Sequence, residues 1–197
     1  VLALDANKDP CRVRSSNAGH ALLTGLALPQ RADQIANTLM NSFTGFGIRT
    51  VAASEIRYNP MSYHNGSIWP HDNALIAVGL ARYGYREAAG RIFAGFFDAA
   101  NYMDMRRLPG LFCGFPRQRG AGPVFYPVAC SPQAWATAAP LLLLQACLGL
   151  SFAPRDKRII FDRPHLPAFV SEITLRNLAV AGEYADVMLR RSHHSVS

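Results

Sequence analysis

Apolar residues recur at helical spacing in four stretches of the first half of the chain, and this periodicity predicts two helical hairpins. The first pair covers Ser16 to Ala27 and Pro29 to about Ser42, where the proline suits the first helical position. The second pair covers Asn73 to Arg82 and Arg86 to Met103. Asn73 to Arg82 is apolar almost all round, which predicts a helix buried on most of its circumference.

A fifth helix is predicted after a long loop. Gly, Pro and aromatic residues alternate from Arg107 to Cys130, which indicates an ordered loop rather than a helix or strand. Ser131 and Pro132 then have the pattern of a cap and a first helical residue. We expect this helix to run to about Leu148 and to kink near Pro140.

The C-terminal part of the chain changes character and predicts strands. Three short β-like apolar runs, separated by Pro, Asn and Gly, cover residues 158–161, 173–178 and 184–189. We expect two or three strands packed on the helices. The pair His193 and His194 is interpreted as part of a frayed terminus.

Composition narrows the class of protein. Half of the 197 residues are hydrophobic and 17% are charged, which suffices for one substantial core and excludes a disordered chain. The net charge of +7 comes almost wholly from scattered arginines, because Lys8 and Lys157 are the only lysines. Without a clustered basic face, no nucleic-acid partner is expected. The most apolar stretch, Ala134 to Leu150, is shorter than the ~20 residues of a membrane span and predicts a buried helix, so no membrane partner is expected either.

The cysteines and the N-terminus bear on compartment. Cys11, Cys113, Cys130 and Cys147 lie far apart and form no Cys-x-x-Cys pair, which favours free thiols in a reducing compartment, although the even count leaves disulfides open. No secretory signal is visible, and a cytoplasmic protein is expected. The chain does not begin with Met, which suggests a longer polypeptide or a processed or truncated one.

The segment from Tyr58 to Asp72 concentrates the side chains that bind sugars. An aromatic ring can cover the apolar face of a sugar, and Asn, His and Asp pair with its hydroxyls. Two histidines seven residues apart without a third ligand argue against a metal site, so no metal or cofactor is expected. The alternatives are that Trp69 anchors the core and that Asp72 stabilises the first helical turn. The candidate substrate-binding residues here are Tyr63, His64, Asn65, Trp69, His71 and Asp72.

The same segment resembles a signature of bacterial glycogen-debranching-enzyme-like proteins, which are similar to amylo-α-1,6-glucosidases. The resemblance rests on Tyr58-Asn59-Pro60 and His64-Asn65-Gly66-Ser67-Ile68-Trp69-Pro70-His71-Asp72-Asn73. Four further motifs agree in order: Ser16-Asn17-Ala18-Gly19-His20, Gly47-Ile48-Arg49-Thr50, Leu111-Phe112-Cys113-Gly114-Phe115 and Cys130-Ser131-Pro132-Gln133-Ala134-Trp135-Ala136.

This resemblance implies a mainly α fold, an (α/α)6 toroid of helical hairpins, whose sugar pocket takes an oligosaccharide or α-glucan. The toroid needs about a dozen helices, and this length offers only about five. We therefore expect residues 1–150 to form a hairpin portion of the C-terminal half of the catalytic domain, and residues 151–197 a C-terminal extension with short strands. The missing N-terminal half, or a second copy in a homo-oligomer, would complete the structure.

The resemblance also implies an inverting pair of carboxyl groups, and neither is evident. No counterpart of the acid-bearing motif occurs in residues 1–57, and Gly110 stands where relatives carry a glutamate as candidate general base. Nothing selects Asp104, Asp98 or Glu55 as a replacement. No catalytic residue is assigned, and the glycoside hydrolase that the resemblance implies is expected to be weakly active or inactive alone.

Two further pairs of residues, and the chain as a whole, each have alternative interpretations. Arg49 and Arg117 are expected to bind sugar hydroxyls or to organise the pocket loops, and structural ion pairs are the equal alternative. Gln133 and Trp135 lie near the pocket by resemblance, although a buried tryptophan is an equal alternative. For the chain as a whole, a non-catalytic carbohydrate-binding or assembly module is the alternative to a hydrolase domain.

Overall fold

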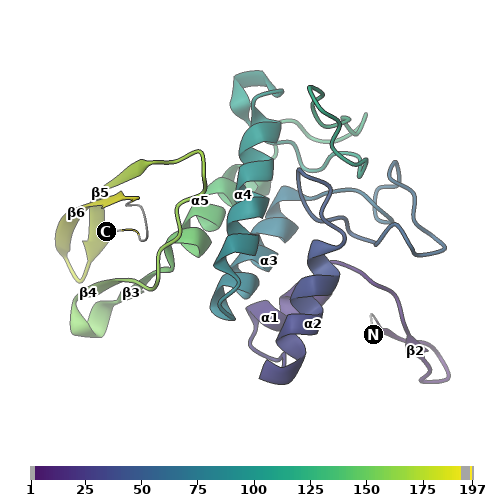
Figure 1. The fold of residues 1–197 in the computed structure, drawn as a ribbon, viewed down its shortest axis with the longest axis horizontal. Coiled ribbons are helices and arrows are strands. Elements are labelled where there is room, and N and C mark those ends of the chain that lie inside the picture. The colour runs from purple at the N-terminus through teal and green to yellow at the C-terminus, as the bar shows by residue number, and fades with distance from the viewer. Residues whose placement is uncertain (1–2, 192–195, 197) are drawn as a thin grey trace.

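The computed structural model describes residues 3–191 and residue 196, and within these residues five α-helices lead into a C-terminal strand region (Figure 1). His193 and His194 lie outside the described residues. Single 3-10 turns occur at Asp104–Arg106 and Pro154–Asp156. The helices are α1 (Ala18–Leu23), α2 (Pro29–Met40), α3 (Pro70–Arg82), α4 (Arg86–Ala100) and α5 (Ala134–Leu148).

Helix α3 is the centre of the helical part, because it contacts α1, α4 and α5. Its buried residues lie around most of its circumference, which confirms the prediction from its all-round apolar sequence. Helix α1 crosses α3 at backbone distance. A Cβ atom on Gly79 would lie 2.9 Å from the Gly19 carbonyl oxygen, and a Cβ on Gly19 would lie 2.6 Å from Ile76 Cγ1. Only glycine at both positions permits this contact.

The predicted helices are present, with different ends. Helix α1 stops at Leu23 rather than near Ala27, because Gly25 adopts a left-handed backbone with φ +75°. Helix α4 ends at Ala100 rather than Met103. Helix α5 was predicted to begin at Ser131 and Pro132, and it begins later. Gln133 still has an extended backbone, so the helix starts at Ala134.

The three predicted strands are confirmed as β4 (Arg158–Phe161), β5 (Glu172–Val180) and β6 (Glu183–Arg190). The periodicity missed β3 (Leu150–Ala153), which pairs with β4, and the short pair β1 (Ala3–Leu4) and β2 (Pro10–Cys11). All three pairs are antiparallel. The turn between β5 and β6 has two residues, Ala181 and Gly182, both with positive φ, as in the tight turns that suit twisted hairpins.

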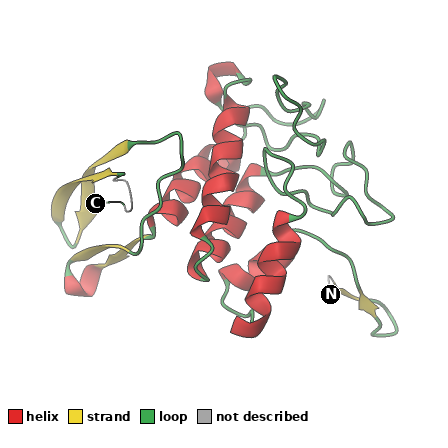
Figure 2. Cartoon of the chain, viewed as in Figure 1, coloured by secondary structure: helices red, strands yellow, loops and turns green. Residues whose placement is uncertain are grey.

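The apolar core has two parts. The larger one fills the space among the helices and includes Leu80, Ile92, Phe96 and Phe112. The smaller one lies where α5 meets the strands and is built on Leu148, Leu166 and Leu189. Figure 2 shows the long loops on one side of the helices and the C-terminal strands β3 to β6 on the other. The division into residues 1–150 and 151–197 stays a prediction.

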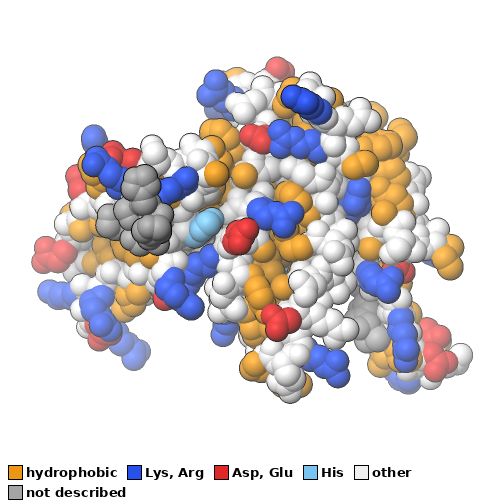
Figure 3. Space-filling model, viewed as in Figure 1, with side chains coloured by type: hydrophobic (Ala, Val, Ile, Leu, Met, Phe, Trp, Pro, Cys, Tyr) orange, Lys and Arg blue, Asp and Glu red, His pale blue; other side chains and the backbone are white. Residues whose placement is uncertain are grey.

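The surface carries charges without a dominant basic face in the view of Figure 3, where Arg and Lys side chains are spread over the molecule. This distribution is consistent with the scattered arginines of the sequence. Within the described residues, no helix combines the length and apolarity that crossing a membrane requires.

Candidate functional site

Backbone hydrogen bonds join five loop segments side by side next to the N-terminal end of α3. Each segment is short and apolar in part, and the bonds between neighbours are 2.9–3.0 Å long. This ladder fixes where the side chains that follow it point. Its bonds run from Ser16 N to Thr50 O, Thr50 N to Ser67 O, Ile68 N to Phe112 O, and Cys113 N to Val124 O.

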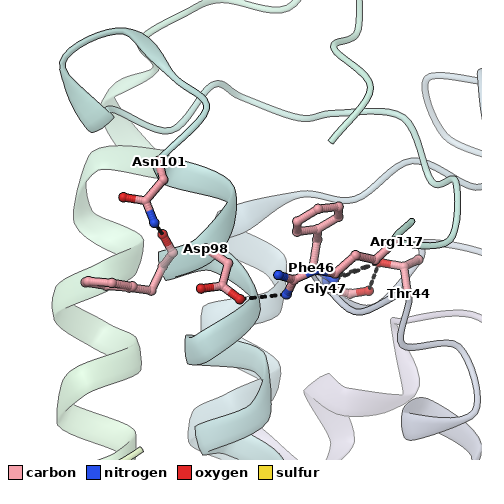
Figure 4. Close-up of polar contacts among 7 residues, drawn as sticks. Thr44, Phe46, Gly47, Asp98, Asn101 and Arg117 are labelled. Atoms are coloured by element: carbon pink, nitrogen blue, oxygen red, sulfur yellow. Dashed lines mark hydrogen bonds and ion pairs between the residues drawn. The ribbon is translucent and has the colours of Figure 1, made fainter. Parts of the chain in front are cut away.

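Arg117 attaches this loop region to α4 (Figure 4). Thr44 Oγ1 accepts hydrogen bonds from the backbone N–H groups of Phe46 and Gly47, which closes a tight turn. The Arg117 backbone N–H donates to the Thr44 carbonyl at 2.8 Å, and its guanidinium donates to Asp98 Oδ2 at 2.6 Å. The guanidinium also lies 5.1 Å from the centre of the Phe46 ring. Of the interpretations given for Arg117, the structure therefore contains the structural ion pair, with Asp98.

Arg49 joins two of the loops and is not among the residues that line the pocket described below, so its contact with a sugar stays a prediction. Arg49 is buried. Its Nε–H donates to the Gly114 carbonyl at 2.7 Å, and Tyr58 Oη donates to the same oxygen at 3.1 Å. A Cβ atom at Gly114 would lie 1.6 Å from the Gly66 carbonyl oxygen, so only glycine fits this junction. The Nε–H group of Arg49 thereby joins its loop to the backbone at Gly114.

Most of the predicted binding residues meet in one pocket of about 370 Å³ at the start of α3. Asn65 does not line it. The Asn65 backbone instead closes the preceding loop, because its carbonyl accepts from Asn59 N and its N–H donates to Ser62 Oγ. The lining residues are Ser16, Asn17, Thr50, Tyr63, His64, Trp69, His71, Asp72 and Trp135.

Trp69 serves mainly as an anchor, which was the alternative to a binding role. Its side chain is largely enclosed, and the residue is only 7% exposed. The indole Nε1–H donates to Ser67 Oγ at 2.9 Å, and that hydroxyl donates to the Tyr63 carbonyl at 2.6 Å. These bonds satisfy the indole inside the protein, so Trp69 supports the pocket from behind and presents little surface to it.

Trp135 is the exposed aromatic plate of the pocket. The resemblance placed it near the pocket, but it was not among the candidate substrate-binding residues. It lies in the first turn of α5 and is 47% exposed. Its ring stacks on His71 with a centroid distance of 4.4 Å and an angle of 20°. Tyr63, 41% exposed, forms a T-shaped pair with Trp69 at a centroid distance of 4.9 Å and adds a second exposed aromatic surface to the pocket. The motif Cys130–Ala136 was the sequence signal that pointed to this tryptophan.

Asp72 is the carboxylate of the pocket, and His20 holds it. His20 Nε2 lies 2.7 Å from Asp72 Oδ1, which links α1 to the first turn of α3. Burial lowers the pKa of His71, an effect that Asp72 opposes and His20 adds to. His71 Nδ1 is buried without a hydrogen-bond partner among the described residues. The pocket thus combines aromatic surface, a carboxylate that contacts His20 and an imidazole whose pKa is lowered by burial.

The remaining carboxylates that were weighed lie in other settings. Glu55 pairs with Arg14 at 3.3 Å, and Asp98 pairs with Arg117. Asp104 is exposed in the 3-10 turn after α4. Among the described residues, no group of three or more His, Cys, Asp or Glu side chains is arranged to hold a metal ion.

Comparison with solved structures gives the fold of relatives. An uncharacterized conserved protein from Thermus thermophilus superposes with a TM-score of 0.57 at 19% identity, over 68% of this chain and 31% of that one. The GH63 mannosylglycerate hydrolase of the same organism, in complex with glucose, gives 0.54 at 21% identity, over 70% and 32%. Its complex with Tris and D-glycerate gives 0.53 at 19% identity, over 70% and 31%.

The chain spans about a third of the length of these solved structures. At such identities the likeness shows the fold: a mainly helical arrangement with small sheets, similar to that of GH63 structures. No curated protein matches the chain. Residues 2–106, slightly more than half of the chain, match the family described as mannosylglycerate hydrolase MGH1-like glycoside hydrolase domain. The expected glycogen-debranching family is thus supported at the level of a glycoside hydrolase, and the chain belongs to the mannosylglycerate hydrolase MGH1-like glycoside hydrolase domain family.

Proposed function

We propose that this chain forms part of an (α/α)6 toroid and supplies one wall of a pocket that takes α-linked glucans or related oligosaccharides. The observation that carries the proposal is the pocket at the start of α3, where Trp135 and Tyr63 expose aromatic surface beside Asp72. A sugar ring has an apolar face that stacks on aromatic rings and equatorial hydroxyls that pair with carboxylate and amide groups. The pocket provides both kinds of contact.

Charge favours a neutral sugar at this wall. Asp72 is the one carboxylate that lines the pocket, and no Arg or Lys among the described residues does so. A carboxylate ligand would therefore lie beside Asp72 without a cation to offset the repulsion. Among the complexes of the mannosylglycerate hydrolase, glucose represents the class expected here and D-glycerate the class disfavoured.

Hydrolysis by this chain alone is expected to be weak or absent. Gly110 occupies the position that the resemblance gives to a glutamate general base, and glycine cannot take a proton from water. The space for a larger residue exists. A Cβ atom on Gly110 would lie 3.6 Å from Gln133 Cγ, an ordinary van der Waals distance. A glutamate can be introduced there without a clash at its first carbon.

The experiment has a binding part and a turnover part. Calorimetry should detect binding of glucose and isomaltose, with D-glycerate as the charged control that binds more weakly. Incubation with isomaltose, maltooligosaccharides and limit dextrin should give no turnover above buffer. Turnover by this chain would contradict the inactive interpretation, and absence of binding to every neutral sugar would contradict the pocket assignment.

The alternative is a non-catalytic carbohydrate-binding module, and Gly110 is the observation that favours it. The two functions can be distinguished by testing the longest polypeptide that contains this chain, as the wild type and as the Gly110→Glu variant. If the wild type binds sugar without hydrolysing it and Gly110→Glu gains turnover, the protein is a hydrolase that has lost its base. If Gly110→Glu also binds without turnover, the binding module is the better description.

We also propose that a partner covers exposed apolar surfaces of the helices. Leu26, Leu141 and Phe97 are large apolar side chains on or beside the helices, and all three are exposed. We expect a second copy or the missing half of the toroid to cover such surfaces. Light scattering over a range of concentrations tests this, and a monomer at high concentration would contradict self-association.

A further inference from the structure

His20 belongs to the motif Ser16–His20, and the pocket described above does not use it directly. Its Nε2 atom lies 2.7 Å from Asp72 Oδ1. The two residues are 52 positions apart and come from different helices, α1 and α3. Their contact is therefore a product of the tertiary structure rather than of local sequence.

The backbone beneath this pair is held firmly. Gly19, the residue before His20, packs against Ile76 of α3, and Gly79 approaches the Gly19 carbonyl one turn further along. No room for a larger side chain exists at either glycine. The crossing of the two helices consequently fixes the backbone positions from which the imidazole and the carboxylate approach each other.

The contact is not needed to cap α3. Trp69 is the N-cap residue and makes no side-chain cap hydrogen bond, while Asp72 lies in the first turn, where the helix dipole already favours a carboxylate. Stabilisation of the first helical turn by Asp72 would not require His20. The pairing instead determines which way the carboxylate is turned.

A carboxylate has two oxygen atoms, and only one of them is occupied. Oδ1 accepts from His20, whereas Oδ2 has no hydrogen-bond partner among the described residues. The Asp72 side chain is 15% exposed and lines the pocket. One oxygen is thus tied to the protein, and the other is left for a hydroxyl group of a ligand.

We infer that His20 is a positioning residue that fixes the Asp72 carboxylate so that Oδ2 is presented to a hydroxyl group of the bound sugar. This inference rests on the proposed function. A fixed carboxylate oxygen accepts a charge-assisted hydrogen bond without first losing rotational freedom, so binding is stronger than to a mobile carboxylate.

Two variants of His20 test the inference. His20→Leu removes the donor, and His20→Gln keeps an Nε2–H at a similar distance from the backbone. Calorimetry with glucose or isomaltose should show about ten-fold weaker binding by His20→Leu and restored binding by His20→Gln. His165→Leu, which alters a histidine outside the pocket, serves as the matched control. Melting temperatures of all variants identify any that fail to fold.

A second measurement does not depend on a sugar. A long-range ¹H–¹⁵N spectrum of the wild type at mildly alkaline pH reports which ring nitrogen of His20 carries the hydrogen, and Nε2 is expected. Hydrogen on Nδ1 alone would overturn the inference, because Nε2 could not then donate to Asp72. Equal sugar affinity of His20→Leu and the wild type would also overturn the inference. If the wild type binds no sugar, the proposed function fails and takes the inference with it.

Discussion

The side-chain amide of Asn73 pairs with both backbone groups of Ile48. Asn73 Oδ1 accepts from Ile48 N at 2.6 Å, and Nδ2 donates to Ile48 O at 3.0 Å. The same Nδ2 donates to Trp69 O at 3.0 Å. These three hydrogen bonds join the first turn of α3 to the loop that contains Ile48, next to the ladder of loop segments. Asn73 is fully buried.

Replacement of Asn73 by alanine should therefore be costly. Asn73→Ala leaves the N–H and C=O of Ile48 buried without partners, and we expect a loss of about 3 kcal/mol in the free energy of unfolding. Urea denaturation measures this. Asn37→Ala, on the exposed face of α2, is the matched control and should change stability by less than about 0.5 kcal/mol. Equal effects of the two changes would contradict the structural role of Asn73.

The two tryptophans should separate stability from binding. Trp69→Ala removes a buried anchor and should cost about 3–5 kcal/mol of stability. Trp135→Ala removes a half-exposed plate and should cost less than about 1 kcal/mol, but should weaken sugar binding about ten-fold. Thermal unfolding and calorimetry give the two quantities. A large loss of stability with unchanged affinity in Trp135→Ala would oppose this division of roles.

His71 should make stability depend on pH in acid. Burial lowers its pKa below the ordinary 6.5, so the unfolded chain binds a proton more readily than the folded one. Its contribution to stability is then complete above pH 6.5 and falls as the pH drops through 6.5 towards the lowered pKa. His71→Phe keeps an aromatic ring on Trp135 without a titrating group. Its unfolding free energy should vary less across that range, and an unchanged slope would count against the assignment.

The four cysteines should differ in reactivity. Burial raises the pKa of Cys147 to about 12 and also raises that of Cys113, so few thiolates form at either site. Cys130 is exposed. A disulfide reagent should modify Cys130 quickly in the native protein and Cys147 only after unfolding. Cys11 is partly exposed and can react as well, so Cys130→Ser should reduce the number of thiols modified in the native protein, whereas Cys147→Ser should leave it unchanged. Rapid native labelling of Cys147 would show that its site is open.

The sequence predicted the helices and the three main strands because each has a hydrophobic period that local spacing records. It missed the ends of α1 and α5, where a left-handed Gly25 and an extended Gln133 decide the boundary. Short pairs such as β1 and β2 contain two residues each, too few to show a period.

Most of the candidate binding residues were predicted in one contiguous segment, and this is only partly how the site is built. Tyr63, His64, Trp69, His71 and Asp72 do line the pocket, but Thr50 reaches it from a distant loop and Trp135 from the first turn of α5. Local sequence also could not tell that Trp69 lies behind the surface while Trp135 lies on it. That difference depends on hydrogen bonds and packing between segments far apart in the chain.

The central claim is that a sugar lies against Trp135, and the indole N–H signals test it most directly. The chain has two tryptophans, so a ¹H–¹⁵N spectrum contains two indole signals, which Trp135→Phe assigns. Titration with glucose or isomaltose should shift the Trp135 signal progressively to saturation and the enclosed Trp69 signal less, with D-glycerate producing smaller changes. A Trp135 signal that stays in place while calorimetry detects sugar binding would contradict the account.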